Sequence, residues 1–440
     1  MQRRDVLKRL FALPAFASAL YAERLLYAER TRGLPPLRID DVRVIPCSPN
    51  RRYQWVFVKI ITNEPGLYGI GSASNLTNAF TVATAIEKHF GPFWIGKDPD
   101  RIEELWESTK TRSYWRNGSI LNNAVSALDV ALWDIKGKRA GMPVYQLLGG
   151  KVRDAVPLYA HAGGRSPVEV EDSVQRYVEE GYRHVRAQIG GYGGGGFVPA
   201  GKGSRPEDGF NGRAFDEELY VRTIPRLFEH LRDKLGWEVK LLHDVHEHLN
   251  PNLAMDFAKR MEPYQMFFVE DILAPEHNSW FEKIRALTST PMAMGELFAH
   301  PREWMPLITN RWIDFIRCRL SQVGGITAGK EIATLCKHFG VRTAWQEGGD
   351  NDPVNQLASY HLDLATSSFG IQEENHFPPV VHEMLPGTAQ LRGGYLYGSD
   401  EPGLGIDINE ELAKNHPLVQ PSGKDNWTTV RRLDGSLVKP

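Results

Sequence analysis

The sequence predicts an α/β fold, with a (β/α) barrel of the TIM type and an α+β capping domain formed by the N-terminal region and the C-terminal tail. Eight short apolar runs between residues 156 and 371 are each separated by enough chain for a helix and its turns. Such a repeat is typical of a parallel barrel. A helical region with strand-like runs precedes the repeat, and a tail rich in glycine and proline follows it. A chain of 440 residues is long enough for both parts.

The chain is expected to divide into four segments. Residues 1–35 are predicted to be an export signal and linker, and residues 36–154 the capping domain. Residues 155–377 are predicted to form the barrel with its metal site, and residues 378–440 a segment that packs on the capping domain.

The first residues indicate export. Arg3 and Arg4 precede a modest apolar stretch, in which small residues stand at Ala15 and Ala17. This order resembles a twin-arginine signal, which predicts a periplasmic or exported protein. The alternative is an N-terminal amphipathic helix on a cytoplasmic protein. The stretch is much shorter than the roughly 18 residues of a membrane span, so no stable membrane insertion is expected.

The composition argues against several classes of protein. Lys and Arg total 52 and Asp and Glu total 54, so the formal net charge is −2 and no basic surplus points to nucleic acid. The three cysteines, Cys47, Cys318 and Cys336, are far apart in the sequence. They form neither a zinc pattern nor a disulfide framework.

Within the capping domain, residues 55–61 are predicted to form a strand and residues 121–137 a helix. Apolar residues between Ala124 and Ile135 recur with the i, i+3, i+4 period of one buried helical face. A further helical turn is expected at residues 144–148, where two glycines then stop it.

Each barrel strand is predicted from an apolar run. The runs are residues 156–160, 184–187, 239–242, 266–269, 292–294, 315–317, 342–345 and 369–371. After the second run, residues 190–196 consist of glycines around Tyr192, which predicts a flexible lid. Gly196 to Lys202 matches the start of a phosphate-binding P-loop, but Gly203 stands where that motif has Ser or Thr. Nucleotide binding is therefore not expected.

Three acidic residues follow three consecutive predicted strands. Asp244 and Glu270 lie 26 residues apart, and so do Glu270 and Glu296. Equal intervals predict equal strand–helix units, and barrel enzymes build their sites at the carboxyl ends of the strands. Converging carboxylates repel each other without a cation, and oxygen ligands suit Mg²⁺, or Mn²⁺, better than Zn²⁺. The alternative is that each acid caps the helix that follows it.

His246 lies two residues after Asp244. If the strand geometry continues, a period of two places both side chains on the same side. A histidine beside a cation can donate or accept a proton near neutral pH. A purely structural histidine, or a zinc site with His243, is the alternative interpretation.

Further motifs resemble the enolase superfamily, in its mandelate racemase/muconate lactonizing enzyme branch. They are Ala127-Leu128-Asp129 and Trp133-Asp134 in the predicted helix, followed by the run from Pro143 to Gly150. Within this branch the chain is most similar to the mannonate/gluconate dehydratase-like family, which includes starvation-sensing members. The supporting residues, from about residue 36 to the end, are His243-Asp244-Val245-His246, Val269-Glu270-Asp271, Gly295-Glu296, Ile316-Arg317, Gly324 to Thr327, Gly370 to Glu373 and Pro402 to Ile406.

The resemblance implies a hydro-lyase, namely a Mg²⁺-dependent acid-sugar dehydratase of the D-mannonate or D-gluconate type. In that family a base removes the proton beside the substrate carboxylate, and the cation stabilises the resulting enediolate. An acid then helps the 3-hydroxyl leave as water, which gives a 2-keto-3-deoxy sugar acid. The expected partners are an acid sugar and further copies of the chain in a homo-oligomer.

The resemblance also implies residue roles. Asp244, Glu270 and Glu296 match the metal ligands, and His246 matches the acid. Arg186 matches an arginine that assists a loop tyrosine acting as base, and Tyr192 is the tyrosine nearest to that place. The substrate-contacting positions are Asn75, His161, Arg317, Gln346 and Glu373.

Two features depart from the family pattern. Gln346 stands where the family usually has histidine, and glutamine can hydrogen-bond a hydroxyl but cannot shuttle a proton. Tyr192 is out of register in a short glycine-rich loop, and Phe197 lies closer to the aligned place. The alternatives are therefore an acid-sugar binding or sensing protein with impaired catalysis, and an epimerase. Neither Arg186 nor Gln188 supplies the lysine pair of racemase relatives, which argues against racemisation.

Overall fold

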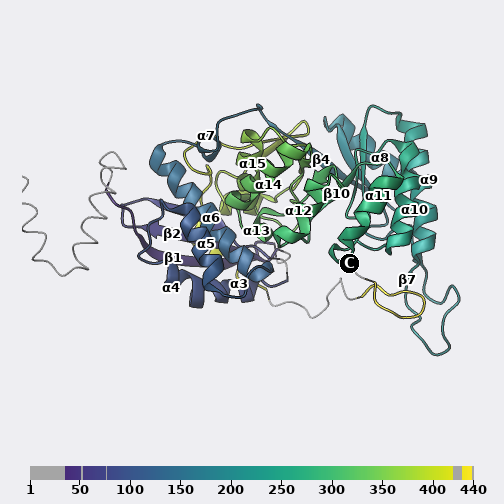
Figure 1. The fold of residues 1–440 in the computed structure, drawn as a ribbon, viewed down its shortest axis with the longest axis horizontal. Helices are drawn as coiled ribbons and strands as arrows, with labels where there is room; N and C mark the ends of the chain where they lie inside the picture. The colour runs from purple at the N-terminus through teal and green to yellow at the C-terminus, as the bar shows by residue number, and fades with distance from the viewer. Residues whose placement is uncertain (1–34, 51–52, 76, 420–428, 439–440) are drawn as a thin grey trace, which may run out of the picture.

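The computed structural model describes residues 35–50, 53–75, 77–419 and 429–438. Figure 1 shows two parts side by side, an α+β part built from N-terminal residues and a barrel built from the middle of the chain. This architecture confirms the predicted fold class. The predicted export signal and linker cover residues 1–35, of which residues 1–34, including the twin-arginine motif, lie outside the described residues. Among those that are described, no helix is long and apolar enough to cross a membrane.

The capping domain combines an antiparallel sheet with helices. The sheet has the order β1-β2-β3, with β1 (Ile39–Cys47), β2 (Trp55–Thr62) and β3 (Tyr68–Ser72). The helices are α3 (Ala79–Ala85), a π-helical turn (Ile86–Phe90), α4 (Gly91–Trp94), α5 (Ile102–Arg112), α6 (Ser119–Ala140) and α7 (Val144–Leu147). The predicted helix at residues 121–137 corresponds to α6, which is slightly longer at both ends.

Two glycines let α6 approach β3 closely. A β-carbon at Gly69 would lie 2.0 Å from the carbonyl oxygen of Ala131, and one at Gly71 would lie 1.9 Å from that of Ala127. Because small residues stand on both sides of this contact, the two backbones meet directly. Asp134 on the same helix accepts hydrogen bonds from the backbone N–H groups of Ile70 (2.9 Å) and Leu404 (2.8 Å). Helix α6 therefore joins the sheet to the C-terminal tail.

The barrel has eight parallel strands. They are β4 (Val156–Gly164), β5 (His184–Ile189), β8 (Lys240–Asp244), β9 (Phe268–Glu270), β10 (Met292–Met294), β11 (Phe315–Ile316), β12 (Arg342–Thr343) and β13 (Gln372–Glu373). β13 pairs with β4, and a bridge between Thr343 and Phe369 joins the eighth segment to β12, so the barrel closes. The predicted run at residues 369–371 therefore contributes only this bridge, and the eighth strand itself begins at Gln372.

Helices surround the strands. They are α8 (Pro167–Glu179), α9 (Glu217–Leu235), α10 (Pro251–Met261), α11 (Phe281–Leu287), α12 (Pro301–Thr309), α13 (Leu320–Val323), α14 (Ile326–Phe339) and α15 (Pro353–Ala365), with 3-10 turns at Glu262–Tyr264 and Pro275–Trp280. Asp129 of the capping helix α6 accepts a hydrogen bond from the backbone N–H of Thr327 in α14 (2.9 Å). Burial raises the pKa of Asp129 to about 7, although the hydrogen bonds from Thr327 oppose the rise.

A separate layer of buried apolar side chains fills the inside of the barrel. It consists of Tyr159, Leu242, Phe268, Ala293, Phe315, Ala344 and Ile371. Strand β5 contributes no apolar side chain to this layer. Its Arg186 is instead the register partner of Leu242, which belongs to the layer. Register partners point to the same side of a sheet, so a buried arginine enters the barrel beside this layer.

The segments that follow the barrel helices touch both parts of the molecule. They are α16 (Pro379–Met384), β14 (Gln390–Arg392), β15 (Tyr395–Tyr397) and α17 (Glu410–Lys414). β15 pairs with β4 of the barrel, while Glu410 of α17 forms an ion pair with Lys59 of β2 (2.8 Å). The predicted lid at residues 190–196 is followed by a short antiparallel ribbon, β6 (Phe197–Val198) with β7 (Ala214–Phe215). The predicted segment boundaries at residues 35, 154 and 377 stay predictions.

Candidate active site

The predicted acidic residues lie at the carboxyl ends of the barrel strands. Asp244 ends β8 and Glu270 ends β9, and the two are register partners. Glu296 lies beyond the end of β10, where the register partner of Glu270 is Ala293. The acids on β8 and β9 therefore stand at one level, and Glu296 reaches the site from the loop after its strand.

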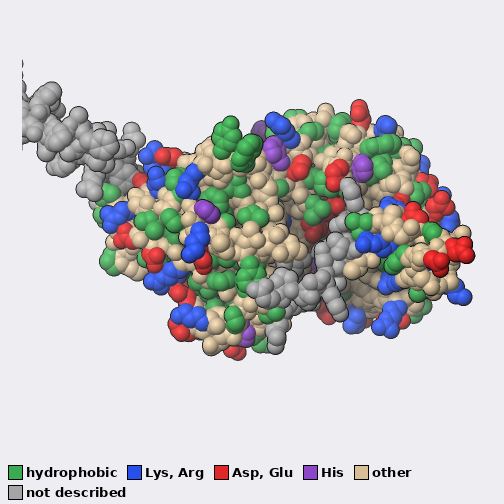
Figure 2. All heavy atoms as spheres, turned by 90° about the horizontal axis from the view of Figure 1, so that it is seen from below, with side chains coloured by type: hydrophobic (Ala, Val, Ile, Leu, Met, Phe, Trp, Pro, Cys, Tyr) green, Lys and Arg blue, Asp and Glu red, His purple; other side chains and the backbone are tan. Residues whose placement is uncertain are grey.

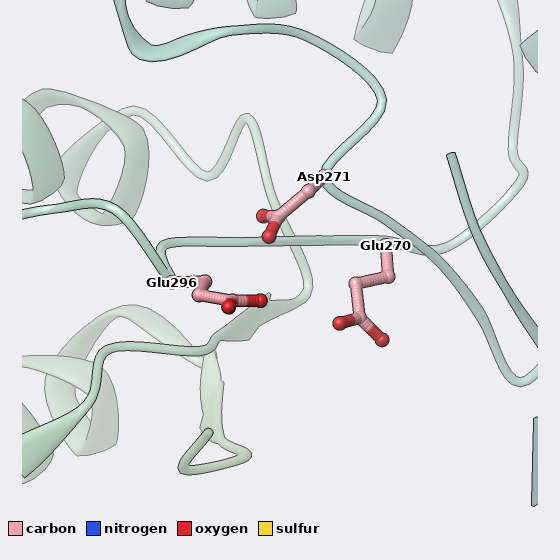
Figure 3. Close-up of side chains that lie close together, drawn as sticks. All are labelled: Glu270, Asp271 and Glu296. Atoms are coloured by element: carbon pink, nitrogen blue, oxygen red, sulfur yellow. The ribbon is translucent and has the colours of Figure 1, made fainter. Parts of the chain in front are cut away.

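A group of three carboxylates forms at this mouth of the barrel. Oxygen atoms of Glu270, Asp271 and Glu296 all lie within 4.8 Å of one another. Figure 3 shows Asp271 and Glu296 turned toward one another, with Glu270 beside them. Asp271 has a left-handed backbone (φ 39°), and its carboxylate also accepts a hydrogen bond from the backbone N–H of Gly295 (3.1 Å).

Asp244 is not a member of this group of mutually close carboxylates. Its Oδ2 accepts a hydrogen bond from Arg186 Nη1 (3.1 Å), and its Oδ1 accepts one from the backbone N–H of His246 (2.7 Å). Two of the three predicted ligands therefore meet, and the third is held by an arginine next to them.

Two buried arginines face the acids. Arg186 Nη1 lies 3.1–3.4 Å from carboxylate oxygens of Asp244, Glu270 and Glu373. Arg317 lies 2.9 Å from Glu270, 2.8 Å from Glu373 and 4.0 Å from Glu296. Figure 2 shows acidic side chains inside the hollow between the two parts of the molecule.

Burial dominates the electrostatics of the carboxylate group. It raises the pKa values of Glu270 and Glu296 well above their ordinary value, and neighbouring acids add to the rise while Arg317 opposes it. The pKa of Asp271 is raised to about 7 for the same main reason. Burial alone would also raise the pKa of Glu373, but Arg317, His161 and Arg186 hold it below its ordinary value.

The residues present fit a hard divalent cation. Oε2 of Glu270 is buried and accepts no hydrogen bond among the residues that the structure describes. Carboxylate oxygens are the ligands that Mg²⁺ prefers, and a cation would relieve the mutual repulsion of the three acids.

The predicted catalytic residues lie beside this group. Arg186 Nη2 donates to the hydroxyl of Tyr192 (3.2 Å), and the Tyr192 ring lies 4.1 Å from the His246 ring between centroids. The charge of Arg186 lowers the pKa of Tyr192. Burial and nearby carboxylates raise this pKa by more than Arg186 lowers it, so the pKa lies above its ordinary value. Burial lowers the pKa of His246.

The expectation that strand geometry continues to His246 is wrong. Strand β8 ends at Asp244, and both His246 (φ 53°) and Glu247 (φ 64°) have left-handed backbones. Each non-glycine residue in such a conformation costs on the order of 1–3 kcal/mol, which the surroundings must offset. The turn nevertheless brings His246 to the site.

The predicted substrate-contacting residues differ in where they lie. His161 Nε2 is 2.9 Å from Glu373, which also pairs with Arg317, so these three meet at the mouth. Gln346 is buried, and its Oε1 accepts no hydrogen bond within the described part of the chain. The carbonyl oxygen of the Asn75 side chain accepts hydrogen bonds from the backbone N–H groups of residues 77 and 78, so it stabilises a turn.

Three neighbouring residues were missed by the sequence analysis. Tyr159 is fully buried and accepts a hydrogen bond from Arg317 (2.6 Å); its position two residues before His161 on β4 was the available signal. Gln188 donates to the backbone carbonyl of Asp244 (2.8 Å). Asp271 stands next to a predicted ligand, but strand alternation predicts that its side chain points away.

Comparisons with known proteins agree with this arrangement. Residues 44–149 match the mandelate racemase/muconate lactonizing enzyme N-terminal domain, and residues 169–412 match the enolase C-terminal domain-like family. A D-galactonate dehydratase family member from a Paenibacillus species is 50% identical over 402 residues, which cover 90% of this chain and 98% of that protein. A member of the same family from Pantoea ananatis is 48% identical over 418 residues, which cover 92% and 99%.

Solved structures give the same result. A crystal structure of an enolase from Pantoea ananatis, with bound D-gluconate and Mg, superposes with a TM-score of 0.88 at 48% identity, covering 92% of this chain and 100% of that one. A structure from Zymomonas mobilis has a TM-score of 0.74 at 27% identity, covering 86% and 98%. The predicted family resemblance is thereby confirmed. The chain belongs to the enolase superfamily and, within it, to the D-galactonate dehydratase family of acid-sugar dehydratases.

Proposed function

We propose that the protein is a Mg²⁺-dependent dehydratase of an acid sugar such as D-gluconate or D-mannonate. The observation that carries this proposal is the meeting of Tyr192, Arg186 and His246 beside the carboxylate group. The relative from Pantoea ananatis supports it, because its structure contains D-gluconate and Mg.

The residues that would hold the cation are Glu270 and Glu296, with Asp244 or Asp271 as a third carboxylate. Bound there, Mg²⁺ would supply positive charge to the substrate carboxylate and to the anion that forms when the neighbouring proton leaves. Replacing Asp244 or Asp271 by asparagine distinguishes the two candidates. Only the loss of the true ligand should weaken Mg²⁺ binding by a large factor.

The side chains around the metal site can perform both proton transfers. The Tyr192 oxygen takes the proton from the carbon beside the substrate carboxylate. Arg186 stabilises the phenolate that this role requires, and a bound cation would offset the nearby carboxylates that raise the pKa of Tyr192. His246 gives a proton to the departing 3-hydroxyl, which leaves as water. The resulting enol then becomes a 2-keto-3-deoxy acid. Glu373 and His161, whose side chains lie 2.9 Å apart, would contact substrate hydroxyls.

The first experiment is turnover. The protein is incubated with Mg²⁺ and a panel of acid sugars, and 2-keto products are measured with semicarbazide. In D₂O, exchange of the proton beside the carboxylate without loss of water would indicate an epimerase. No keto product and no exchange with any acid sugar would contradict enzymatic activity.

A second candidate function is binding or sensing of an acid sugar without efficient catalysis. Gln346 favours it, because a glutamine replaces a residue that could move a proton. Tight, Mg²⁺-dependent binding of D-gluconate without turnover would support this candidate. Export by a twin-arginine signal and assembly into a homo-oligomer are further proposals. Cell fractionation tests the first, and light scattering of the purified protein tests the second.

A further inference from the structure

The loop after β8 requires support from outside itself. Residues 245–250 carry His246, and their two left-handed residues hold a backbone that side chains of this kind rarely adopt. At the near end of the loop, the backbone N–H of Glu247 donates to the carbonyl of Asp271 (2.7 Å). At its far end, the loop meets Glu217, the first residue of α9.

Four donors converge on the carboxylate of Glu217. Its Oε2 accepts hydrogen bonds from the backbone N–H (3.2 Å) and the side-chain amide of Asn250. Its Oε1 accepts from Nε (3.0 Å) and Nη2 of Arg432, which lies in the C-terminal segment. Glu217 is only 9% exposed, whereas the side chain of Arg432 is 38% exposed, so water reaches the pair only from the arginine side.

The C-terminal segment continues the ribbon that follows β5. The backbone N–H of Phe215 in β7 donates to the carbonyl of Arg431 (2.8 Å), and Arg431 in turn bridges to Leu437. Figure 1 shows this C-terminal segment in yellow beside the loop that carries β7. Residues 429–438 therefore form an outer edge of the β6–β7 ribbon.

The same ribbon packs against the loop of His246. The Phe215 ring lies 5.2 Å from the His248 ring, and the Tyr192 ring lies 4.1 Å from the His246 ring. The backbone carbonyl of Gly196, between Tyr192 and β6, accepts a hydrogen bond from the N–H of Asp216, the residue before Glu217. Three segments thus meet around one carboxylate: the ribbon, the β8 loop and the C-terminal segment.

We propose that Glu217 is a positioning residue, which ties Arg432 and Asn250 together and thereby sets the distance between Tyr192 and His246. This inference rests on the proposed function, because those two residues are its base and acid. An exposed ion pair contributes little to stability. The pair between Glu217 and Arg432 differs, because the nearly buried carboxylate of Glu217 joins three segments. We therefore expect the pair to affect the distance between Tyr192 and His246 more than the stability of the protein.

Hydrogen exchange tests the positioning without any turnover. Arg432→Met removes the ion pair, while Arg260→Met removes a surface pair of α10 (Arg260–Asp256, 2.7 Å) that touches none of the three segments. We expect faster amide exchange at residues 190–198 and 245–250 in Arg432→Met and unchanged exchange there in Arg260→Met. Arg432→Lys should restore part of the protection. Faster exchange confined to residues 429–438 would overturn the proposal.

Asn250 offers a sharper kinetic test. Its Oδ1 caps α10 by accepting from the backbone N–H groups of Asn252 (3.1 Å) and Leu253 (3.2 Å). Asn250→Asp keeps this cap but sets a second carboxylate against Glu217, whereas Asn250→Ser keeps the cap without the charge. With Mg²⁺ and D-gluconate we expect kcat to fall about 10-fold in Asn250→Asp, with little change in KM, and a smaller fall in Asn250→Ser.

The outcomes of the two experiments separate the two proposals. If the wild-type protein turns over no acid sugar, the proposed function fails, and the exchange experiment still decides the positioning. If turnover occurs but Asn250→Asp leaves kcat unchanged, or changes KM and kcat in parallel with the melting temperature, the positioning role is wrong.

Discussion

Replacement of Arg317 by methionine should destabilise the protein strongly in the absence of Mg²⁺ and less in its presence. Arg317 is completely buried and contacts Glu270 at 2.9 Å and Glu373 at 2.8 Å. Two unit charges about 4 Å apart interact by about 4 kcal/mol at an effective dielectric constant of about 20. Removal of one partner from a buried pair costs roughly 3–5 kcal/mol, which agrees with that value.

The cation should replace part of the lost charge. In Arg317→Met the carboxylates of Glu270 and Glu296 lose a competing positive group, so they should bind Mg²⁺ more tightly. A tenfold lower Kd would return about 1.4 kcal/mol of stability at a saturating Mg²⁺ concentration. Urea unfolding followed by tryptophan fluorescence, in EDTA and in Mg²⁺, measures both free energies of unfolding.

Arg319→Met is the matched control. Arg319 is also buried, but it pairs with Asp350 and Asn351, away from the carboxylate group. Its loss should destabilise the protein equally in EDTA and in Mg²⁺. If Arg317→Met shows the same independence from Mg²⁺, the cation does not bind among these carboxylates and the reasoning is refuted.

Four further predictions follow from the same geometry. His246→Asn should lower turnover at least about 100-fold and leave Mg²⁺ affinity nearly unchanged in calorimetry, so surviving turnover would mean that His246 is not the acid. Tyr192→Phe should abolish deuterium exchange beside the carboxylate, and continued exchange would point to another base. The pKa of Asp271 is raised to about 7, and protons compete with the cation for its carboxylate. Mg²⁺ affinity should therefore rise as the pH increases through 7, and binding should release protons to the buffer. An affinity that does not change with pH would contradict this prediction. Gly71→Ala should destabilise the protein by at least about 1–3 kcal/mol in urea unfolding, because its β-carbon would meet the carbonyl of Ala127, and an unchanged midpoint would disprove that contact.

The sequence predicted features that depend on local period and spacing. Eight apolar runs predicted the barrel because each strand must bury a short apolar segment, whatever its neighbours are. The equal intervals after Asp244 and Glu270 predicted that Glu270 and Glu296 approach each other, because equal strand–helix units bring strand ends to one edge. Their role as metal ligands stays a prediction.

Features that depend on backbone strain or distant contacts could not be predicted. Asp271 should point away from Glu270 by strand alternation, but its left-handed backbone turns it into the same group. The contact between Glu217 and Arg432 joins residues 215 positions apart, and nothing in either local pattern indicates it. Arg186 was expected at the site from the family resemblance, but no local pattern indicated that it occupies the barrel interior, where the neighbouring strand has Leu242.

The charges at the barrel mouth explain why metal, protons and arginines must act together. Four carboxylates, those of Asp244, Glu270, Glu296 and Glu373, share the two guanidinium groups of Arg186 and Arg317. If all are ionised, two negative charges remain uncompensated in a space where only Glu296 is partly exposed, and such charges are normally removed by protonation or by a bound cation. A divalent cation would balance this network, and Asp271, with a pKa raised to about 7, would add one further negative charge only above that pH.

An anionic substrate can therefore enter favourably only when the cation is already bound. This predicts that Mg²⁺ binds before the acid sugar and that D-gluconate shows no measurable binding in EDTA.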